Sequence, residues 1–504
     1  MGRHARKAAP LGIVLDSSQP ESLHRQIWQQ LRRAILERRL APGMRLPSSR
    51  LMAVEFACAR GTVLAALDQL IAEGYLVTRT GSGVSVATDL PSEMLVPPLA
   101  GGPQDRPGTA ASVLPRRTLA LLAREPAPMP DGAPPIAFPI GQPDRTAFPF
   151  PLWAKLLEQQ WRKPAWQVAG AAYPFGHPAL RAAIASYLGA ARGFACDPRA
   201  VVVTSGVQQG VSLFARVALE AGDGVWIEEP AYPGMAAGLA AAQVRAVPVP
   251  IDASGFSPDA AMAMAPNARM AVVAPSHQFP LGTVLTLQRR LALLSWAERT
   301  QGWIVEDDFD GEYRYSGRPL APLRALDRSG RVAYLGSFSK LLFPALRLSY
   351  LVLPASLVDA AERSAAGVST PAPLLGQGAL ARFIADGHLA AHLRRTRLLY
   401  AGRQQTLIAS AARHLAGLLD IAPDPGGMHL VARPHPDLGA GFDDLAAAAA
   451  ARTAGVQVSP LSACYRGVPM AQGFLLGYAG TPEHQIEPAV MLLRDVLRGR
   501  FRPA

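Results

Sequence analysis

Lysine is rare in this chain, and one lysine has neighbours that suit covalent chemistry. Of the 50 Lys and Arg residues only four are lysines, namely Lys7, Lys155, Lys163 and Lys340. A guanidinium cannot serve as a Schiff-base amine, whereas a lysine with a lowered pKa can. Lys340 ends the segment Gly-Ser-Phe-Ser-Lys, which follows the apolar run Val332–Leu335. We therefore expect Lys340 to be the amine that binds an aldehyde.

Anion-binding groups stand near this lysine and after a second apolar run. Ser337 lies in the same segment and Arg347 lies a little further along the chain. A hydroxyl and a bidentate guanidinium both suit a phosphate. The run Val201–Thr204 leads into a predicted helix start, where backbone N–H groups can bind an anion. The residues expected to form this second anion site are Gly206, Val207 and Gln208.

An acid and an aromatic ring complete the set. Asp307 directly follows the run Trp303–Glu306, and it would keep a pyridine nitrogen protonated so that the ring withdraws electrons. Tyr232 follows the run Val225–Glu228 and would stack on such a ring. Ligands of α/β folds gather at the carboxyl ends of strands, so these groups should converge. Together they predict a site for pyridoxal 5′-phosphate (PLP), although each one alone has an ordinary surface, capping or core explanation.

Three zones follow from the patterning of the chain. Residues 136–504 alternate nearly all-apolar β-like runs with helical segments, which predicts an α/β fold with a mostly parallel sheet covered on both faces. Residues 89–135 are rich in Pro and Gly and show little periodicity, which predicts an extended linker. Residues 16–88 are expected to fold separately, as three helices followed by a hairpin.

The N-terminal zone has the features of a DNA-binding module. The net charge of the chain is +12, and residues 1–88, with twelve Lys or Arg and six Asp or Glu, carry +6 of it. In a helix-turn-helix the first residues of the second helix meet base edges. Arg60 and Thr62 are expected to begin the recognition helix. Arg50 is expected to face the phosphate backbone of the DNA, and Gly81 to lie at the tip of the hairpin.

Two resemblances strengthen these interpretations. The segment from Leu23 to Val86 resembles the GntR-type winged helix-turn-helix in its Pro-Gly turn, its Leu-Pro-Ser-Ser-Arg turn, its Arg-x-Thr-Val helix start and its Gly-rich wing. Residues 136–504 resemble the fold-type I (class I/II) aminotransferases, in stretches such as Val-Val-Val-Thr-Ser-Gly-Val-Gln-Gln-Gly and Gly-Ser-Phe-Ser-Lys. Nearly the whole chain is similar to the MocR subfamily of GntR regulators.

The resemblance implies a role for each candidate. It implies that Lys340 forms the Schiff base, that Asp307 pairs with the pyridinium and that Tyr232 stacks on the ring. It implies a homodimer in which Tyr173 reaches the phosphate of the partner's site. The residues that it assigns to phosphate are Ser337, Arg347, Gly206, Val207 and Gln208, and those that it assigns to DNA are Arg50, Arg60, Thr62 and Gly81.

Two positions depart from the related aminotransferases. Phe309 stands where a Tyr often bonds the 3′-oxygen of the cofactor, and Leu475 stands where an Arg usually binds the α-carboxylate of a substrate. Loss of that charged contact would remove roughly 1.5–3 kcal/mol of binding free energy from an amino acid. His429 could compensate or could be structural. These departures favour sensing of PLP itself or of an unusual amine over ordinary transamination.

Three functions are compatible with these features. The first is a regulator that binds operator DNA and whose DNA binding or transcription responds to PLP or to a PLP–amine adduct. The second is a working aminotransferase with an accessory N-terminal domain, and the third is a DNA-binding protein whose large domain has lost its cofactor. No long apolar segment is present, and Cys58, Cys196 and Cys464 lack metal-site spacing, so we expect a cytoplasmic protein with no membrane or metal partner.

Overall fold

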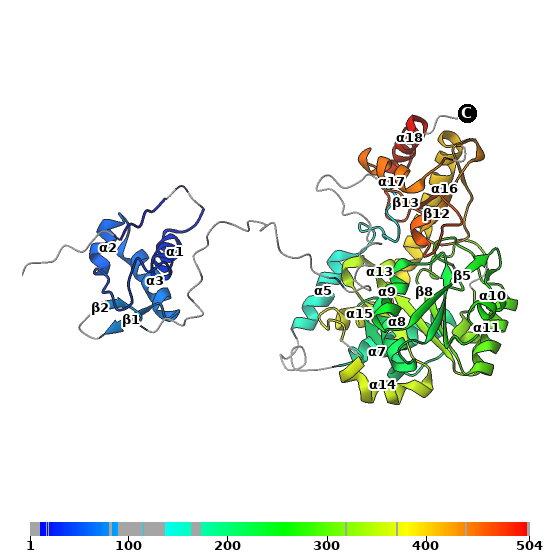
Figure 1. The fold of residues 1–504 in the computed structure, drawn as a ribbon, viewed down its shortest axis with the longest axis horizontal. Coiled ribbons are helices and arrows are strands. Elements are labelled where there is room, and N and C mark those ends of the chain that lie inside the picture. Colours follow the sequence, from blue (N-terminus) through cyan, green and yellow to red (C-terminus); the bar gives the residue numbers. More distant parts are fainter. Residues whose placement is uncertain are drawn as a thin grey trace, which may run out of the picture. The chain divides into compact units, whose positions relative to one another are not determined.

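The computed structural model divides the chain into two compact units, residues 1–113 and residues 114–504 (Figure 1). Apart from residue 114, the predicted linker 89–135 lies outside the part of the chain that is described. The structure describes residues 11–16, 18, 20–79, 83–88, 114, 137–162, 173–317, 320–368, 371–438 and 441–500.

In its described residues, the N-terminal unit contains three helices and two paired strands, in agreement with the predicted three helices and hairpin. Its elements are α1 (Leu23–Leu36), α2 (Ser49–Glu55), α3 (Arg60–Ala72), β1 (Leu76–Arg79) and β2 (Gly83–Val86). The apolar stripe of α1 is buried, with Ile27 and Leu31 fully shielded, and it packs on α3. Ser48 caps α2 by accepting a hydrogen bond from the backbone N–H of Leu51. Strands β1 and β2 pair antiparallel, which completes a winged helix-turn-helix.

The larger unit is built on a sheet whose strand order is β3-β10-β9-β8-β7-β4-β5-β6. Strands β4, β5, β7, β8 and β9 pair in parallel, whereas β10 is antiparallel to both of its neighbours and β6 is antiparallel to β5. The strands are β3 (Val201–Thr204), β4 (Gly224–Glu229), β5 (Arg245–Asp252), β6 (Gly255–Phe256), β7 (Met270–Val273), β8 (Trp303–Asp308), β9 (Val332–Ser337) and β10 (Ser349–Val352). The predicted α/β fold with a mostly parallel sheet is confirmed.

Helices cover both faces of this sheet (Figure 1). The helices of the unit are α5 (Phe150–Trp161), α7 (Pro178–Arg192), α8 (Val207–Ala218), α9 (Pro233–Ala241), α10 (Pro258–Met264), α11 (Leu287–Thr300), α12 (Leu323–Leu326), α13 (Phe338–Leu341), α14 (Ala355–Val368), α15 (Gln377–Ala385), α16 (His388–His414), α17 (Asp444–Thr453) and α18 (Glu483–Arg500). Neighbouring strand residues point to opposite faces, so Val225 joins the core beneath α8 and Trp226 the core beneath α11. Burial on both faces explains why the strand sequences are apolar throughout.

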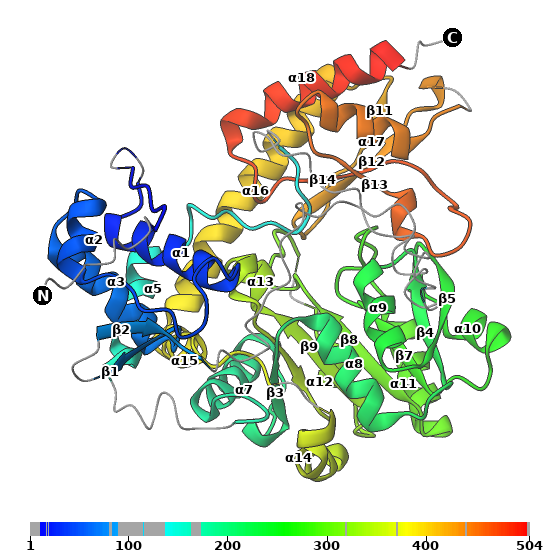
Figure 2. The same cartoon turned by 60° about the vertical axis from the view of Figure 1, so that its left-hand side comes forward.

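A second, antiparallel sheet lies in the C-terminal part of the unit. It has the order β11-β12-β14-β13, formed by β11 (Leu419–Ile421), β12 (His429–Pro434), β13 (Ser459–Pro460) and β14 (Phe474–Gly477). Helices α16 and α18 lie side by side next to it (Figure 2). In the part of the chain that the structure describes, none of the helices combines the length and hydropathy needed to cross a membrane.

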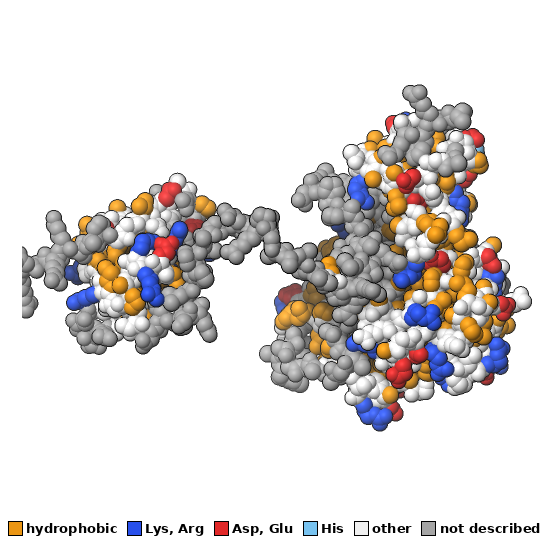
Figure 3. Space-filling model, viewed as in Figure 1, with side chains coloured by type: hydrophobic (Ala, Val, Ile, Leu, Met, Phe, Trp, Pro, Cys, Tyr) orange, Lys and Arg blue, Asp and Glu red, His pale blue; other side chains and the backbone are white. Residues whose placement is uncertain are grey.

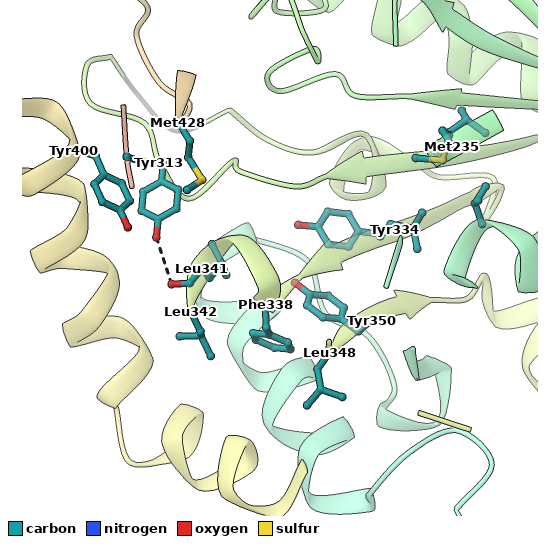
Figure 4. Close-up of a cluster of buried hydrophobic side chains, with 14 of the residues drawn as sticks. Met235, Tyr313, Tyr334, Phe338, Leu341, Leu342, Leu348, Tyr350, Tyr400 and Met428 are labelled. Atoms are coloured by element: carbon teal, nitrogen blue, oxygen red, sulfur yellow. Dashed lines mark hydrogen bonds between the residues drawn. The ribbon is translucent and has the colours of Figure 1, made fainter. Parts of the chain in front are cut away.

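A cluster of buried side chains supports the short helix α13, which carries Lys340 (Figure 4). Phe338 and Leu341 are buried on either side of the lysine, and the ring of Phe338 lies 5.3 Å from that of Tyr350. The hydroxyl of Tyr313 donates a hydrogen bond of 3.4 Å to the backbone oxygen of Leu341. These contacts fix a four-residue helix that could not persist alone, and thereby fix the direction of Lys340.

Substitution of Phe338 tests this support. We expect Phe338→Ala to lower the free energy of unfolding by about 3–5 kcal/mol, because it leaves a cavity under α13. Chemical denaturation followed by circular dichroism measures the change. The matched control is Leu398→Ala, since Leu398 is 74% exposed and its loss should have little effect. Equal effects of the two substitutions would contradict the role given to the cluster.

Candidate cofactor site and DNA-binding surface

A cavity of about 490 Å³ opens at the carboxyl ends of β3, β4, β8 and β9. This volume lies in the range of small-molecule and cofactor sites. Its lining comes from seven segments of the sequence: residues 140–141, 205–209, 232, 279, 307–309, 337–349 and 428–429. Eight of the nine predicted cofactor residues line it, namely Lys340, Asp307, Tyr232, Gly206, Val207, Gln208, Ser337 and Arg347.

Lys340 is held in the cavity by a contact that the sequence did not reveal. Its Nζ donates a hydrogen bond of 3.1 Å to the backbone oxygen of Gly141. A Cβ atom at position 141 would lie 2.1 Å from Nζ, and Gly141 has a φ of +63°, so any other residue would displace the amine and adopt a backbone conformation that favours glycine. Burial lowers the pKa of Lys340, while the nearby carboxylates of Asp310 and Asp307 raise it in part. The net lowering increases the fraction of unprotonated amine, which is the nucleophilic form.

Asp307 provides a buried carboxyl with an unused oxygen. It lies near the end of β8, and its Oδ1 has no hydrogen-bond partner among the described residues. Burial raises the pKa of Asp307 from 3.8 to about 7, and the charge of Asp310 adds to the shift, whereas Lys340 opposes it. A buried acceptor of this kind is costly unless a partner arrives. The protonated nitrogen of a pyridine ring would be such a partner.

Another group of cavity residues suits a phosphate. The twelve-residue helix α8 begins at Val207, directed by Gly206 in a conformation (φ +155°, ψ 165°) that is almost confined to glycine. The backbone N–H groups of its first turn are free of intrahelical partners, as at any helix start. Ser337 Oγ accepts a hydrogen bond of 3.0 Å from Ser349 Oγ, and both side chains line the cavity. Arg347 follows the 3₁₀ turn Pro344–Leu346, and its own backbone is left-handed (φ 50°, ψ 39°). It also lines the cavity.

Tyr232 provides the aromatic surface. It follows β4, is 40% exposed, and its hydroxyl accepts a hydrogen bond of 3.4 Å from Gln208 Nε2. Its ring lies edge-on to Phe279 with the centroids 6.1 Å apart. The ring is therefore oriented by contacts at both ends while part of it stays accessible to a ligand.

One predicted cofactor residue, Tyr173, does not line this cavity in its own chain. Tyr173 is half-buried, its ring lies 5.6 Å from that of His177, and it does not contribute to the lining. Sequence reasoning also missed several residues that do line the cavity, among them Gly141, Phe279, Ser339 and Ser349. Of these, only Ser339 and Ser349 carried a signal, as hydroxyls flanking Lys340 and Arg347.

The N-terminal unit presents two exposed arginines, Arg50 and Arg60, at the starts of two helices. Arg60 is exposed at the first position of α3, and its Nε donates a hydrogen bond of 3.1 Å to Ser49 Oγ at the first position of α2. Arg50 is exposed beside Ser49, and Thr62 is half-buried. Figure 3 shows Lys and Arg side chains on the visible face of this unit. The helix starts are the positions that a helix-turn-helix presents to DNA.

The wing adds one arginine that sequence reasoning missed. Arg45 forms a backbone bridge with Ser85 of β2, and its guanidinium lies within contact distance of a Cβ built at Gly83. Arg45 therefore lies beside β2, with its guanidinium next to Gly83. Gly81, predicted at the tip, lies outside the described residues.

Comparison with known proteins identifies the families of both domains. Residues 138–491 match the family of aminotransferase class I and II, and residues 23–86 match the gntR family of bacterial regulatory proteins. The chain is 40% identical to the probable rhizopine catabolism regulatory protein MocR of Rhizobium meliloti, over 96% of this chain and 95% of that protein. It is 31% identical to the pyridoxine biosynthesis transcriptional regulator PdxR of Corynebacterium glutamicum, over 97% and 99% of the two chains.

Among solved structures, the larger unit resembles the α-aminoadipate aminotransferase LysN of Thermus thermophilus. The TM-score is 0.63 and the sequences are 27% identical, over 72% of this chain and 92% of that one. That structure holds N-(5′-phosphopyridoxyl)-L-leucine. The class defined by fold and site is therefore a winged helix-turn-helix protein with a fold-type I aminotransferase-like domain. The chain belongs to the MocR-type family of GntR regulators.

PLP is the cofactor of this domain, and the residues present fit it. The cavity offers an amine with a lowered pKa, a carboxyl with an unpartnered oxygen and a helix N-terminus beside an arginine. These groups match the aldehyde, the ring nitrogen and the phosphate of PLP in turn. Phe309 lines the cavity without a hydroxyl, so it cannot donate the hydrogen bond that a Tyr would give to the 3′-oxygen.

Replacement of Asp307 separates stability from cofactor affinity. The unfolded chain releases the Asp307 proton near pH 4 and the folded chain near pH 7, so the free energy of unfolding falls across this interval and stays low above it. An asparagine at position 307 cannot ionise, so the Asp307→Asn variant does not lose stability across this pH interval. We expect the cofactor-free variant to melt at a higher temperature than the wild type at pH 8, with a smaller difference at pH 5, and to bind PLP more weakly.

Thermal melting between pH 5 and 8 and a fluorescence titration with PLP check these two effects. Asp420→Asn is the matched control, because Asp420 is exposed and outside the cavity. A variant that is less stable than the wild type at pH 8, or one that keeps full PLP affinity, would contradict the assignment.

Proposed function

We propose that this chain is a PLP-dependent DNA-binding transcription regulator, in which PLP or a PLP–amine adduct in the larger unit controls DNA binding or transcription. The observation that carries the proposal is the presence, in one chain, of a GntR-type winged helix and a cavity lined by Lys340, Asp307 and Arg347. Relatives that match this chain over nearly their full length are named as transcription regulators. Such a regulator acts where the chromosome lies, in the cytoplasm.

Each cavity residue has a defined task in this proposal. Lys340 would hold the aldehyde carbon of the cofactor covalently, and Gly141 would accept a hydrogen bond from its nitrogen until then. Asp307 would keep the ring nitrogen protonated, and Tyr232 would cover one face of the ring. When bound, PLP supplies an electrophilic carbon that reacts with amines. Arg347, Ser337 and the start of α8 would hold the phosphate.

Regulation requires a homodimer with two winged helices. In helix-turn-helix dimers the two recognition helices enter successive major grooves, so their spacing decides how well both half-sites are read. A ligand changes this spacing only if it binds one conformation of the protein more tightly than another. Tyr173, which lies away from the cavity of its own chain, would contact the phosphate in the partner's cavity.

Replacement of Lys340 tests the cofactor half of the proposal. We expect wild-type protein with PLP to show an absorbance band near the visible edge and to retain the cofactor after borohydride reduction. Lys340→Ala should lose both, because no amine remains to bind the aldehyde. Lys155→Ala is the control, since Lys155 is an exposed lysine on α5. Absorbance spectra and the mass of the reduced protein give the result.

The same variants test the link between the two units. Footprinting on DNA from beside the gene of this protein, with and without PLP, should show a PLP-dependent change for the wild type and none for Lys340→Ala. A response that persists in Lys340→Ala would exclude the covalent bond as the switch. Steady turnover of amino acids with an oxo-acid acceptor would instead favour the enzyme alternative.

Replacement of Arg60 tests the DNA half. We expect Arg60→Ala to weaken specific DNA binding by about 1–3 kcal/mol and to relax base preference at one position of the site. Arg33→Ala is the matched control, because Arg33 is an exposed arginine on α1 that pairs with Glu37 at 2.7 Å. Electrophoretic mobility shift assays at two salt concentrations separate loss of a base contact from loss of charge. Equal losses for both variants would contradict a specific role of Arg60.

A further inference from the structure

One side of the cavity is aromatic. Phe279, Phe309 and His429 line it together, and we call them the aromatic wall. The ring centroid of Phe279 lies 6.1 Å from that of Phe309 and 5.4 Å from that of His429. Met428 and Ile140 extend this apolar lining. Such a surface favours apolar or aromatic groups, whose burial releases water.

The charged groups of the cavity are already matched to the cofactor. Among the described residues that line it, the cations are Lys340 and Arg347 and the anion is Asp307. In the proposed function these three groups bind the aldehyde, the phosphate and the ring nitrogen. A ligand carboxylate would then meet no remaining arginine or lysine from these residues. Burying an unpaired carboxylate is strongly unfavourable.

His429 does not supply the missing cation. Its Nε2 lies 2.9 Å from the backbone oxygen of Pro280, which can only accept, so Nε2 is the donor. Burial lowers the pKa of His429, and the positive charge of His277 lowers it further. His277 itself keeps its proton despite burial, because Asp310 and Asp424 flank it and its pKa is about 10. The ring in the cavity is thus a neutral imidazole.

The support beneath the aromatic wall is apolar as well. Leu475 of β14 is fully buried, and Ile140 and Phe279 pack against the cluster that it forms with Leu461 and Cys464. Leu475 pairs with Val431 across the C-terminal sheet. Residues two apart in a strand share a face, so Leu475 lies on the same face as His429. A charged side chain is absent from this position directly behind the wall.

We propose that the amine effector of this protein is a primary amine that lacks a carboxylate and whose non-reacting end is apolar or aromatic. The proposal rests on the proposed function, in which PLP fills the charged part of the cavity. The ligand nitrogen would replace the lysine nitrogen on the aldehyde carbon: one C=N bond forms and one breaks. The two N–H hydrogens that the ligand amine loses are taken up by the freed amine of Lys340, and the total charge does not change. No oxidant or reductant is needed.

Matched pairs of ligands test the proposal directly. Full-length protein loaded with PLP is titrated with tyramine and tyrosine, and with phenethylamine and phenylalanine, while the cofactor absorbance is followed. We expect each amine to bind at least tenfold more tightly than the amino acid that differs from it by one carboxylate. Equal binding, or tighter binding of the amino acids, would overturn the proposal.

A substitution behind the wall gives a second measurement. Leu475→Arg should raise the affinity for tyrosine and so reduce the difference in affinity between each amine and its matching amino acid. Leu475→Met should preserve the wild-type preference for the amines. If the arginine variant does not fold, the wild-type titration alone decides whether amines bind more tightly than the matching amino acids. Loss of the Lys340-dependent band would remove the proposed function and this inference together. An intact band with no preference for amines would remove this inference alone.

Discussion

The larger unit depends on keeping an amine and a carboxyl buried in one cavity without letting them neutralise each other. The amine of Lys340 is held by the backbone oxygen of Gly141, and Oδ1 of Asp307 has no partner among the described residues. Burial disfavours the charged form of both groups, so the pKa of the lysine falls and that of the aspartate rises. Such opposed shifts are typical of functional sites, because the folded chain is held ready for a ligand at some cost in stability.

The sheet explains how the two groups reach the same cavity. Strands β8 and β9 are parallel neighbours, and Asp307 lies opposite Leu335 in their register. Lys340 follows β9 by three residues, on a helix anchored by Phe338 and Leu341. Because parallel strands end at the same edge of the sheet, an acid at one strand end and a lysine after the next are brought together by topology alone. The side chains then need only local support.

This topology also separates what could be predicted from what could not. The candidates around Lys340, Asp307 and Tyr232 were predictable because each follows an apolar strand and the strand ends converge. Gly141 was not, since it stands in a segment without periodicity and acquires its role only through the closeness of its backbone to Lys340. The antiparallel sheet β11–β14 was not predicted from the sequence for a related reason. Two of its strands span three residues or fewer, which is too short for a periodic pattern.

Coupling between cavity and DNA needs a difference in binding energy between two states, and the cavity contains groups suited to create one. The C-terminal sheet contributes His429 and carries Leu475 behind the aromatic wall. Asp307 comes from β8 of the large sheet, and Lys340 and Arg347 come from the segment between β9 and β10. His277 links the two parts, with Asp310 from the end of β8 on one side and Asp424 from the C-terminal part on the other. A ligand that fills the space between these parts contacts both only when they are close, so it must favour a closed arrangement. In the regulator proposed above, such a shift is the change that a homodimer with two winged helices would convert into altered DNA affinity.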